Sequence, residues 1–524
     1  MARISVRRAL GGRPLLGLAG VTWLAVGCQV LTGISDYETV DGLGGGGAAS
    51  STSTGAGPST GGQGGTGGTI VVVDAPTVVW RYAGVSGAGS FTRGLGIGVG
   101  SVPGSPTVVG AVRGGTASLD DFDVSGPRTR SVSFEVVDAT TVQNESFGVP
   151  SPGAQEAAYS AVSKSGVIGR AGIFKLTIGQ TALAVDGPTV TGTQFSLDDD
   201  VTPETLASSD TRAMGVHAFG SDDVMVAGNF TGDITVGVGA EGYVGTGLHA
   251  IVVRSDTAQA NPWHVEIGVT QDTSGDIWVE DFAFEDNRAI MVGRYTGSGN
   301  GFQLTTVPGG QTINLASTSD NGSDITDVFY AEVLASGALG EVRGITRLDN
   351  QAFTEVERQG DSLFIGGHFT GTLAFSNAPG EAATSDEERG FVARLAAQDL
   401  SSPRVVQFAG ESARVSAMAA NADDLYVTVD CSGSVDVLIA NSPVFTTAGG
   451  SDDLCFFGFD MATSPPTLTT ATRFEGDVID AEDMIFDAGD VFVTGTYSGQ
   501  WNLPDQMRVS NDDALFVLRL TPPD

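Results

Sequence analysis

Hydrophobic and polar positions along the chain follow one recurring pattern: an apolar strand, a glycine, an aromatic residue and a closing glycine. The pattern is clearest in VFVTGTYSG at residues 491–499. It returns as VMVAGNFTG at 224–232, AIMVGRYTG at 289–297, LFIGGHFTG at 363–371 and, weakened, LYVTVDCSG at 425–433. Because self-similarity at a fixed period identifies a repeat architecture, the chain is expected to be an array of similar units.

The number of units follows from their spacing. The closing glycines recur roughly every 65 residues, and VVGAVRG at 108–114 fits the same template. Because the distance from Gly114 to Gly232 is close to two periods, one degenerate unit is expected between them, around VIGRAGIFKL at 167–176. The spacing therefore predicts seven units.

Each clear unit contains several strand signals. The glycine–aromatic strand is followed by a second strand such as LAF at 373–375, an acidic turn, and a third strand such as FVARL at 391–395. An apolar segment such as VVQFAG at 405–410 and an alternating stretch such as VSAMAA at 415–420 come next. About four short strands per unit, repeated seven times, predict an all-β fold, a seven-bladed β-propeller.

The two ends of the repeat array complement each other. The last unit stops after FVLRL at 516–520 and lacks its apolar segment, whereas VVWRYAG at 78–84 has the character of that missing strand. We therefore expect the N-terminal strand to pair with the last blade and close the ring, since pairing removes open sheet edges. Two stacked β-sandwich domains are the alternative.

The N-terminal residues 1–27 have the features of an export signal. Four arginines precede an apolar run at 15–27 that is too short to span a membrane as a mature helix. LAVGC at 24–28 resembles a bacterial lipobox, which implies that Cys28 becomes the lipidated N-terminus, with acyl chains such as palmitate. The alternative for Cys28 is an incidental thiol at the end of a cleaved peptide.

Residues 28–69 are predicted to be a flexible tether after the lipidated cysteine. Residues 44–68 are almost wholly Gly, Ser, Thr and Ala, a composition that cannot bury enough apolar surface to fold. The folded part is expected at 70–524. Gln29 after the cysteine resembles the sorting signal for the outer membrane, on the periplasmic side or at the cell surface.

The clear units resemble a bacterial β-propeller repeat family whose units have VxGxFxG, a turn rich in Gly and Asp, and an FVxRL or FVxKL strand. The similarity extends from about residue 215 to 524 and is poor over 85–214. With the lipobox and tether, the chain looks like a surface lipoprotein of the cell envelope. The family implies a fold and a location, with no single activity attached.

Charge restricts the partners. The formal net charge of −36 argues against nucleic acid, whose phosphates need clustered Lys and Arg, and against anionic membrane surfaces. Membrane contact is therefore expected only through the lipid anchor. We expect a monomer with an unknown protein or carbohydrate ligand.

Cys431 and Cys455 both fall in the sixth unit. Cys431 occupies the aromatic position of the repeat, and Cys455 aligns with Leu515 of the third strand in the last unit. In an exported chain a disulfide between them is predicted, stabilising by about 3 kcal/mol in the chain-entropy model. Two buried free thiols or redox chemistry are the alternatives.

Other chemistry-bearing residues give weaker signals. Acidic residues recur before the third strands, where turn formation explains them and calcium binding is the alternative: Asp324, Asp327, Asp386, Glu387, Asp452, Asp453, Asp512 and Asp513. The histidines at 217, 249, 264 and 368 form no metal-binding motif, and His368 is expected to be structural. Trp80 and Trp263 are expected in the core, whereas Trp278 and Trp501 suit either core packing or carbohydrate stacking.

The sequence predicts no catalytic residue, cofactor or metal site, so an enzyme is not favoured. We interpret the chain as a lipid-anchored β-propeller of the cell envelope that acts as a binding or interaction module. The alternatives are a propeller-type enzyme acting on polysaccharide, as a lyase or glycosidase, and a purely structural envelope protein.

Overall fold

The computed structural model is all-β over the residues that it describes. Those residues are 73–83, 91–113, 117–119, 122–124, 129–138, 141–147, 156–160, 170–177, 180–186, 211–218, 223–231, 234–235, 242–243, 248–256, 263–269, 275–285, 288–297, 302–307, 310–315, 327–346, 350–375, 383–447, 449, 452–503 and 506–523. No helix able to cross a membrane occurs in this part of the chain. The predicted export signal at 1–27, Cys28 and the predicted tether at 28–69 lie outside the described residues.

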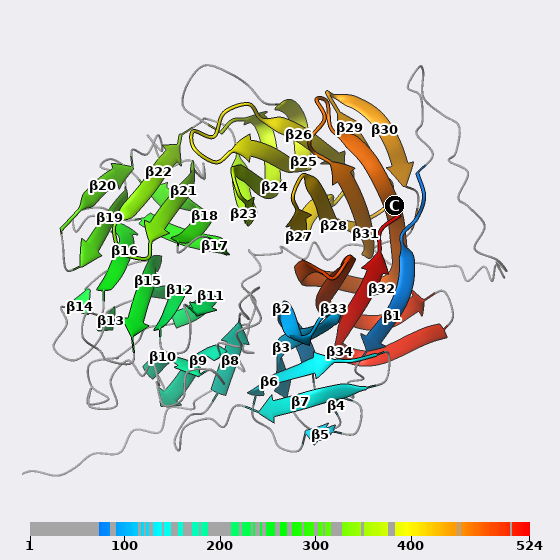
Figure 1. Ribbon diagram of the computed structural model, residues 1–524, viewed down its shortest axis with the longest axis horizontal. Helices are drawn as coiled ribbons and strands as arrows, with labels where there is room; N and C mark the ends of the chain where they lie inside the picture. The colour runs from blue at the N-terminus through cyan, green and yellow to red at the C-terminus, as the bar shows by residue number, and fades with distance from the viewer. Residues whose placement is uncertain are drawn as a thin grey trace, which may run out of the picture. The chain divides into compact units, whose positions relative to one another are not determined.

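The described strands form eight antiparallel sheets (Figure 1). We divide the seven-stranded sheet at β32 and set the two two-stranded sheets aside, which leaves consecutive groups here called units 1 to 7. Unit 1 consists of β2 (Phe91–Val102), β3 (Ser105–Arg113), β6 (Thr129–Val136) and β7 (Val142–Phe147). Unit 2 consists of β8 (Glu156–Ser160), β9 (Arg170–Thr177) and β10 (Gln180–Asp186). Unit 3 consists of β11 (Thr211–Ala218), β12 (Asp223–Thr231), β15 (Leu248–Asp256) and β16 (Trp263–Val269).

The remaining units follow in chain order. Unit 4 consists of β17 (Gly275–Glu285), β18 (Arg288–Gly297), β21 (Asp327–Leu334) and β22 (Leu339–Ile345). Unit 5 consists of β23 (Gln351–Gln359), β24 (Ser362–Leu373), β25 (Ala383–Ala396) and β26 (Arg404–Ala409). Unit 6 consists of β27 (Arg414–Asn421), β28 (Asp424–Cys431), β31 (Asp453–Asp460) and the first half of β32 (Thr467–Asp487). Unit 7 consists of the second half of β32, β33 (Asp490–Leu503), β34 (Gln506–Thr521) and β1 (Thr77–Ala83).

Short hairpins lie between the second and third strands of several units. They are β4 (Ala117–Leu119) with β5 (Phe122–Val124), β13 (Ile234–Thr235) with β14 (Gly242–Tyr243), β19 (Phe302–Val307) with β20 (Thr312–Leu315), and β29 (Val435–Ile439) with β30 (Ser442–Thr447). In unit 5 the glycine–aromatic strand β24 itself continues to Leu373. The sequence-based expectation of a separate strand at 373–375 was therefore wrong.

The glycine of the repeat is required by a close approach of two strands. In units 1 and 3 to 7 the pairing of the first and second strands shifts by one residue at the same repeat position, as a β-bulge does. A Cβ on Gly293, Gly367 or Gly495 would lie 2.0 Å from a carbonyl oxygen of the bulged first strand. At these three positions only glycine fits without moving the backbone, whereas unit 6 has Val429 at the equivalent position.

The disulfide replaces an aromatic cluster at this position. Cys431 and Cys455 form a disulfide with an S–S distance of 2.09 Å, as predicted. Cys455 pairs with Val429, whereas in unit 7 the equivalent glycine, Gly495, pairs with Phe516. Cys455 therefore corresponds to Phe516, and its alignment with Leu515 was wrong by one residue. Unit 6 thus has Val and Cys where unit 7 has Gly and Phe.

The apolar core lies between neighbouring units. Separate clusters of buried side chains join units 3 and 4, units 4 and 5, units 5 and 6, and units 6 and 7. A further cluster joins unit 7 to unit 1, with Ile485 and Phe492 packed among Ile97, Val108 and Phe134. A sheet with apolar residues on both faces therefore packs against a neighbouring sheet on each face.

Hairpins also join neighbouring units through the backbone. β19 of unit 4 pairs with β16 of unit 3, and β29 of unit 6 pairs with β26 of unit 5. The extended end of β33 pairs with β32 at Glu475 and Gly476, which belong to unit 6. We call these segments arms, since each extends from its own unit to the last strand of the preceding unit.

The N-terminal strand pairs with the last unit, as the sequence indicated. β1 lies antiparallel to β34 (Figure 1), with Val78 opposite Leu520 and Ala83 opposite Phe516. Unit 7 therefore obtains its fourth strand from the opposite end of the chain.

One aspartate at the bulge of the first strand joins neighbouring units at each of two equivalent contacts. Asp281 of β17 accepts hydrogen bonds from the backbone N–H of Phe282 and, in unit 5, of Val356, both at 2.7 Å. Asp483 of β32 accepts from its neighbour Met484 at 2.8 Å and from Ile97 of unit 1 at 2.9 Å. The contact from unit 7 to unit 1 is thus built like the contact from unit 4 to unit 5.

Candidate functional site

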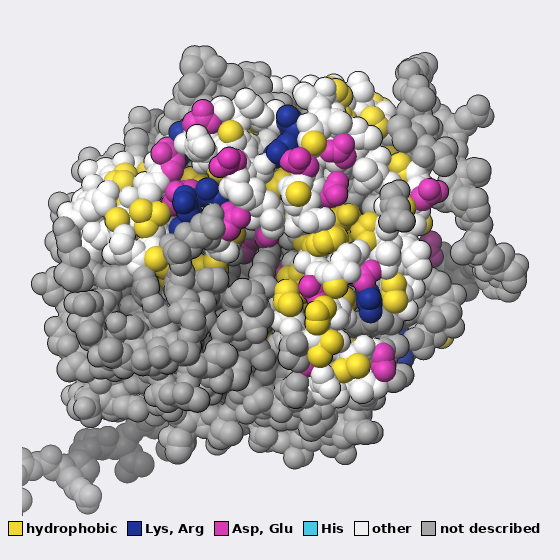
Figure 2. All heavy atoms as spheres, viewed as in Figure 1, with side chains coloured by type: hydrophobic (Ala, Val, Ile, Leu, Met, Phe, Trp, Pro, Cys, Tyr) yellow, Lys and Arg dark blue, Asp and Glu magenta, His cyan; other side chains and the backbone are white. Residues whose placement is uncertain are grey.

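Polar or charged side chains occur at two facing repeat positions near the bulges of the first strands. The position on the first strand, two residues before the bulge, holds Arg414 in unit 6 and Asp480 in unit 7, but Trp278 and Ala352 in units 4 and 5. The facing position on the second strand, just before the motif aromatic or its replacement, holds Arg294, His368, Asp430 and Thr496 in units 4 to 7. With their ion-pair partners they form a group that we call the polar belt: Arg93, Glu280, Arg294, His368, Glu388, Arg414, Asp430, Asp480 and Asp513. Figure 2 shows acidic and basic side chains interspersed on one face of the described residues.

The arginines of the polar belt already have carboxylate partners. Arg294 donates to Glu280 at 2.7 Å, and its guanidinium carbon lies 4.8 Å from the centre of the Trp278 ring. Arg414 of unit 6 donates to Glu388 of unit 5 at 2.8 Å. Arg93 of unit 1 pairs with Asp513 of unit 7 through its Nε at 2.7 Å.

His368 is an uncharged member of the polar belt at neutral pH. Its pKa is lowered from 6.5 to about 4, mainly by burial and also by the nearby charge of Arg414, while Glu388 opposes the effect. A neutral imidazole both donates and accepts a hydrogen bond. The expectation that His368 is structural rested on its repeat position; the structure adds that it lies among ionisable groups.

Asp430 and Asp480 are carboxyl groups of the polar belt whose pKa values are raised. The pKa of Asp430 is raised from 3.8 to about 8, mainly by burial and also by the charges of Asp480 and Glu482, while Ser416 and Arg414 act in the opposite direction. Burial also raises the pKa of Asp480. Asp430 is therefore mostly protonated at neutral pH, since its pKa lies above 7.

Polar atoms without partners occur at this level of the described sheets. Asp430 is partly exposed as a residue, but its Oδ1 atom has neither solvent contact nor a hydrogen-bond partner. The hydroxyl oxygens of Thr496, equivalent to Asp430 in unit 7, and of Thr354, at the bulge of unit 5, are also buried without partners. Buried polar atoms nearly always have a hydrogen-bond partner, and water can supply it for such atoms.

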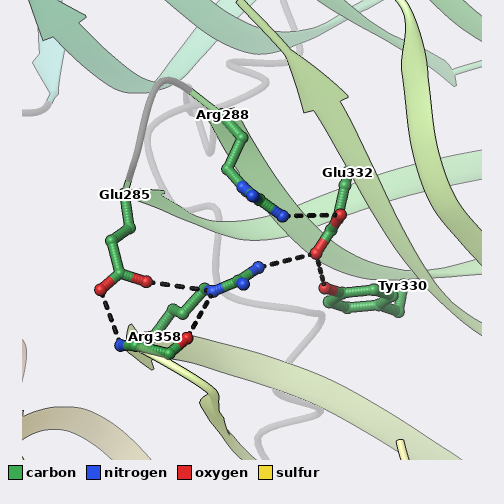
Figure 3. A network of polar contacts seen from close by, with 6 residues as sticks. Glu285, Arg288, Tyr330, Glu332 and Arg358 are labelled. Atoms are coloured by element: carbon green, nitrogen blue, oxygen red, sulfur yellow. Dashed lines mark hydrogen bonds and ion pairs between the residues drawn. The ribbon is translucent and has the colours of Figure 1, made fainter. Parts of the chain in front are cut away.

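A second polar network lies at the opposite ends of the first strands (Figure 3). Arg358 donates to Glu332 at 2.8 Å and pairs with Glu285 at 3.0 Å, while Arg288 lies 3.3 Å from Glu332. The Tyr330 hydroxyl donates to Glu332 at 2.6 Å. With every carboxylate here paired, the network joins units 4 and 5 and is structural.

The arginine of the FVxRL motif also has a structural role, as unit 7 shows. In unit 7, Arg519 donates to Asp490 at 2.8 Å, linking the third strand to the start of the second. By register, Glu332 and Arg288 of unit 4 occupy the positions of Arg519 and Asp490, with the two charges exchanged. The FVxRL motif therefore indicates fold and not ligand binding.

Several sequence-based expectations can be compared with these contacts. Trp501 is fully buried between Tyr497 and Phe516, at 5.2 and 4.9 Å between ring centres, so core packing is correct and carbohydrate stacking is wrong for it. Asp453 is buried and accepts from Arg473 and from the Gly476 N–H, a strand-end role. No group of three or more potential metal ligands occurs among the described residues.

Other expected site residues are outside what the structure describes. Cys28 and Asp324 lie in undescribed segments, and the side chains of Trp80, Trp263 and the histidines at 217, 249 and 264 are undescribed although their strands are placed. The polar belt itself was missed by the sequence interpretation. Its signal was present: Asn229, Arg294, His368, Asp430 and Thr496 are polar residues at one column of an otherwise apolar motif.

Comparison with known proteins gives little further information. No protein-family model matches the chain, and no curated protein matches it in sequence. Among solved structures, the subtype N11 neuraminidase-like protein of A/flat-faced bat/Peru (H18N11) is similar over 87% of this chain and 99% of that chain, with 9% identity and a TM-score of 0.35.

Proposed function

We propose that the chain is a lipid-anchored seven-bladed β-propeller of the cell envelope that binds a polar ligand at its polar belt. Seven consecutive sheet units, each packed on its neighbours in the well-described part, support the propeller. Closure of the ring is supported by the cluster that joins units 7 and 1 and by the pairing of β1 with β34. The equivalent bonds of Asp281 and Asp483 add to this support.

Anchoring rests on the sequence. The lipobox-like LAVGC at 24–28 and the tether at 28–69 would hold the propeller at the outer membrane, on the periplasmic side or at the cell surface. Exchange of the lipidated cysteine, Cys28→Ser, should abolish incorporation of radiolabelled palmitate and release the chain from the membrane fraction. Labelling of Cys28→Ser equal to that of the natural chain would contradict the anchor.

One observation supports ligand binding most directly: Asp430 Oδ1 is buried without a hydrogen-bond partner, although the carboxyl group belongs to the polar belt. Propellers bring side chains of several blades together at one end of the ring. Contacts within the polar belt run from unit 4 to unit 1, so a ligand there would touch several units.

The binding proposal is tested with named envelope polymers. The Cys28→Ser chain would be applied to immobilised peptidoglycan, lipopolysaccharide and a lysine-rich envelope protein fraction, together with Asp430→Asn and Asp480→Asn. The matched control is Asp361→Asn, an exposed carboxyl in the turn between β23 and β24. We expect retention that is lost in the two belt variants and kept in the control. Equal retention of all four proteins, or of none, would refute binding at the polar belt.

A polysaccharide-degrading enzyme is the second candidate. A carboxyl group that stays protonated at neutral pH, as Asp430 does, is the group that a general acid requires. Release of reducing or unsaturated sugar ends from a polysaccharide panel, lost in Asp430→Asn, would favour the enzyme over the binding module.

A further inference from the structure

We propose that the indole of Trp278 is a stacking platform for an uncharged sugar ring whose hydroxyl groups are bound by Arg294 and Glu280. This inference rests on the proposed function and names the class of ligand recognised at the polar belt. All three residues lie on the first two strands of unit 4, with Trp278 and Glu280 on β17 and Arg294 on β18.

The three side chains lie together on the face of unit 4 that is turned toward unit 5. Trp278 and Arg294 are directly opposite each other on neighbouring strands, so they share one face of the sheet. Ile277 and Val279 belong to the apolar cluster that joins units 3 and 4. Because side chains alternate between the two faces of a strand, Trp278 points the other way. Glu280, the extra residue of the bulge, accepts from Arg294 at 2.7 Å.

This group remains accessible, unlike the tryptophan of the core. Trp278 is half-buried, and the side chains of Arg294 and Glu280 are 24% and 20% exposed, whereas Trp501 is fully buried. The guanidinium carbon of Arg294 lies over one face of the indole, 4.8 Å from the ring centre. Because β17 is the first strand of its sheet, β18 approaches the indole from one side only. The opposite ring face is therefore the one on which a ligand stacks.

Unit 5 contributes a further donor at the same level. Two hydrogen bonds with equal separation along the chain join β17 to β23: Val356 N–H to Asp281, and Gly360 N–H to Glu285. The two strands therefore run side by side in the same direction, which puts Gln351 close to the level of Trp278. Gln351 shares a face with Phe353, a member of the cluster that joins units 4 and 5. The Gln351 side chain is buried, and its Nε2 donor has no partner.

The chemistry of this group suits a sugar ring. Arg294 has N–H donors and Glu280 has carboxylate acceptors, and a hydroxyl group both donates and accepts a hydrogen bond. The indole is a large apolar surface that matches the C–H face of a pyranose ring. Sites for small ligands combine such apolar surface with a few polar groups that fix orientation. One half-exposed aromatic ring beside an ion pair is this combination.

The sugar should be uncharged. Glu280 already compensates the charge of Arg294, so an anionic ligand gains little from that arginine. A cation on the free indole face would lie near the Arg294 charge, and like charges repel. The net charge of −36 also disfavours acidic polysaccharides. We therefore expect chains of neutral hexoses or N-acetylhexosamines as ligands.

The test uses the tetrasaccharides of glucose, mannose, galactose and N-acetylglucosamine as probes, and tetragalacturonate as the charged comparison. Saturation-transfer NMR with the Cys28→Ser chain shows which sugar protons contact the protein, and titration of tryptophan fluorescence gives the affinity. We expect at least one neutral tetrasaccharide to bind through the C–H protons of one ring face and to shift the emission. Tetragalacturonate should bind more weakly.

Variants of the same chain assign the binding to the platform. Trp278→Ala should weaken binding at least about tenfold and abolish the emission shift, because it removes a large apolar contact surface. Trp278→Phe should retain part of the affinity, and Arg294→Met should weaken binding several-fold. The matched control is Trp501→Phe, which changes a fully buried ring and should bind and shift like the parent chain. Asp361→Asn should also bind like the parent chain.

Three outcomes would overturn the inference: no neutral tetrasaccharide binds, tetragalacturonate binds as tightly, or folded Trp278→Ala binds like the parent chain. Circular dichroism shows whether each variant is folded, and Arg294→Met keeps the test informative if Trp278→Ala is not. Retention of an envelope polymer that depends on Asp430 but is unaffected by Trp278→Ala and by excess tetrasaccharide would refute the sugar platform and leave the proposed function standing.

Discussion

Asp430→Asn should flatten the dependence of stability on pH. The folded chain holds the Asp430 proton with a pKa of about 8, whereas the unfolded chain holds it with the ordinary value of 3.8. Between these values the folded state binds more protons than the unfolded state, so the free energy of unfolding falls as pH rises. The stabilisation is fully present below pH 3.8 and is lost as pH rises through 8.

The magnitude follows from the linkage relation. One pKa unit corresponds to about 1.4 kcal/mol, so Asp430 should make the natural chain lose about 2.7 kcal/mol between pH 5 and pH 7. His368 acts in the opposite direction between pH 4 and 6.5, because its pKa is lowered to about 4. That contribution is present in both proteins, so it cancels when Asp430→Asn is compared with the natural chain.

The assay is urea unfolding followed by circular dichroism at pH 5, 6 and 7. The stability of Asp430→Asn relative to the natural chain should rise by about 1.4 kcal/mol per pH unit, with equal m values in both proteins. Asp361→Asn should show a constant difference across the series. A constant difference for Asp430→Asn as well would refute the perturbed carboxyl and remove the main support for the site.

Three further comparisons test the fold. Arg358→Met removes the shorter of the two ion pairs of the buried Glu332 and should lower the free energy of unfolding by about 3 kcal/mol, whereas the more exposed Arg343→Met should cost about 1 kcal/mol or less in the same urea assay. Replacing Cys431 and Cys455 by Ala should cost about 3 kcal/mol and abolish the effect of reductant on the unfolding midpoint; a midpoint that still responds would contradict the disulfide. Gly495→Ala should cost about 1–3 kcal/mol in thermal unfolding, because its Cβ meets a backbone carbonyl; an unchanged melting temperature would contradict the close approach.

Sequence alone predicted the repeated features of the fold. The period of the glycine–aromatic motif indicated repeated sheet units of an all-β fold, and the composition of residues 78–84 indicated the partner of the last unit, which β1 is. The cysteines were recognisable because both replaced repeat residues within one unit. The register of Cys455 was misjudged because the segment between closing glycine and third strand differs in length from unit to unit, so no fixed offset aligns the two strands.

The candidate site could be predicted only in part. A polar column within the motif, including His368 and Asp430, was readable from aligned repeats. That the charge of Asp480 acts on the Asp430 carboxyl depends on how unit 6 packs on unit 7, which the spacing of residues does not give. Likewise, the exchange of charges between Glu332 and Arg288 becomes visible only once the strands are in register.

The arms and β1 determine the order in which the strands can find partners. Each arm pairs with the last strand of the preceding unit. The outer strands of units 3, 5 and 6 therefore remain unpaired only until the next unit has been synthesised. β1 instead stays unpaired until β34 has emerged, because that strand is its partner. An unpaired strand edge invites aggregation, so folding of this chain should depend on protecting β1 throughout synthesis.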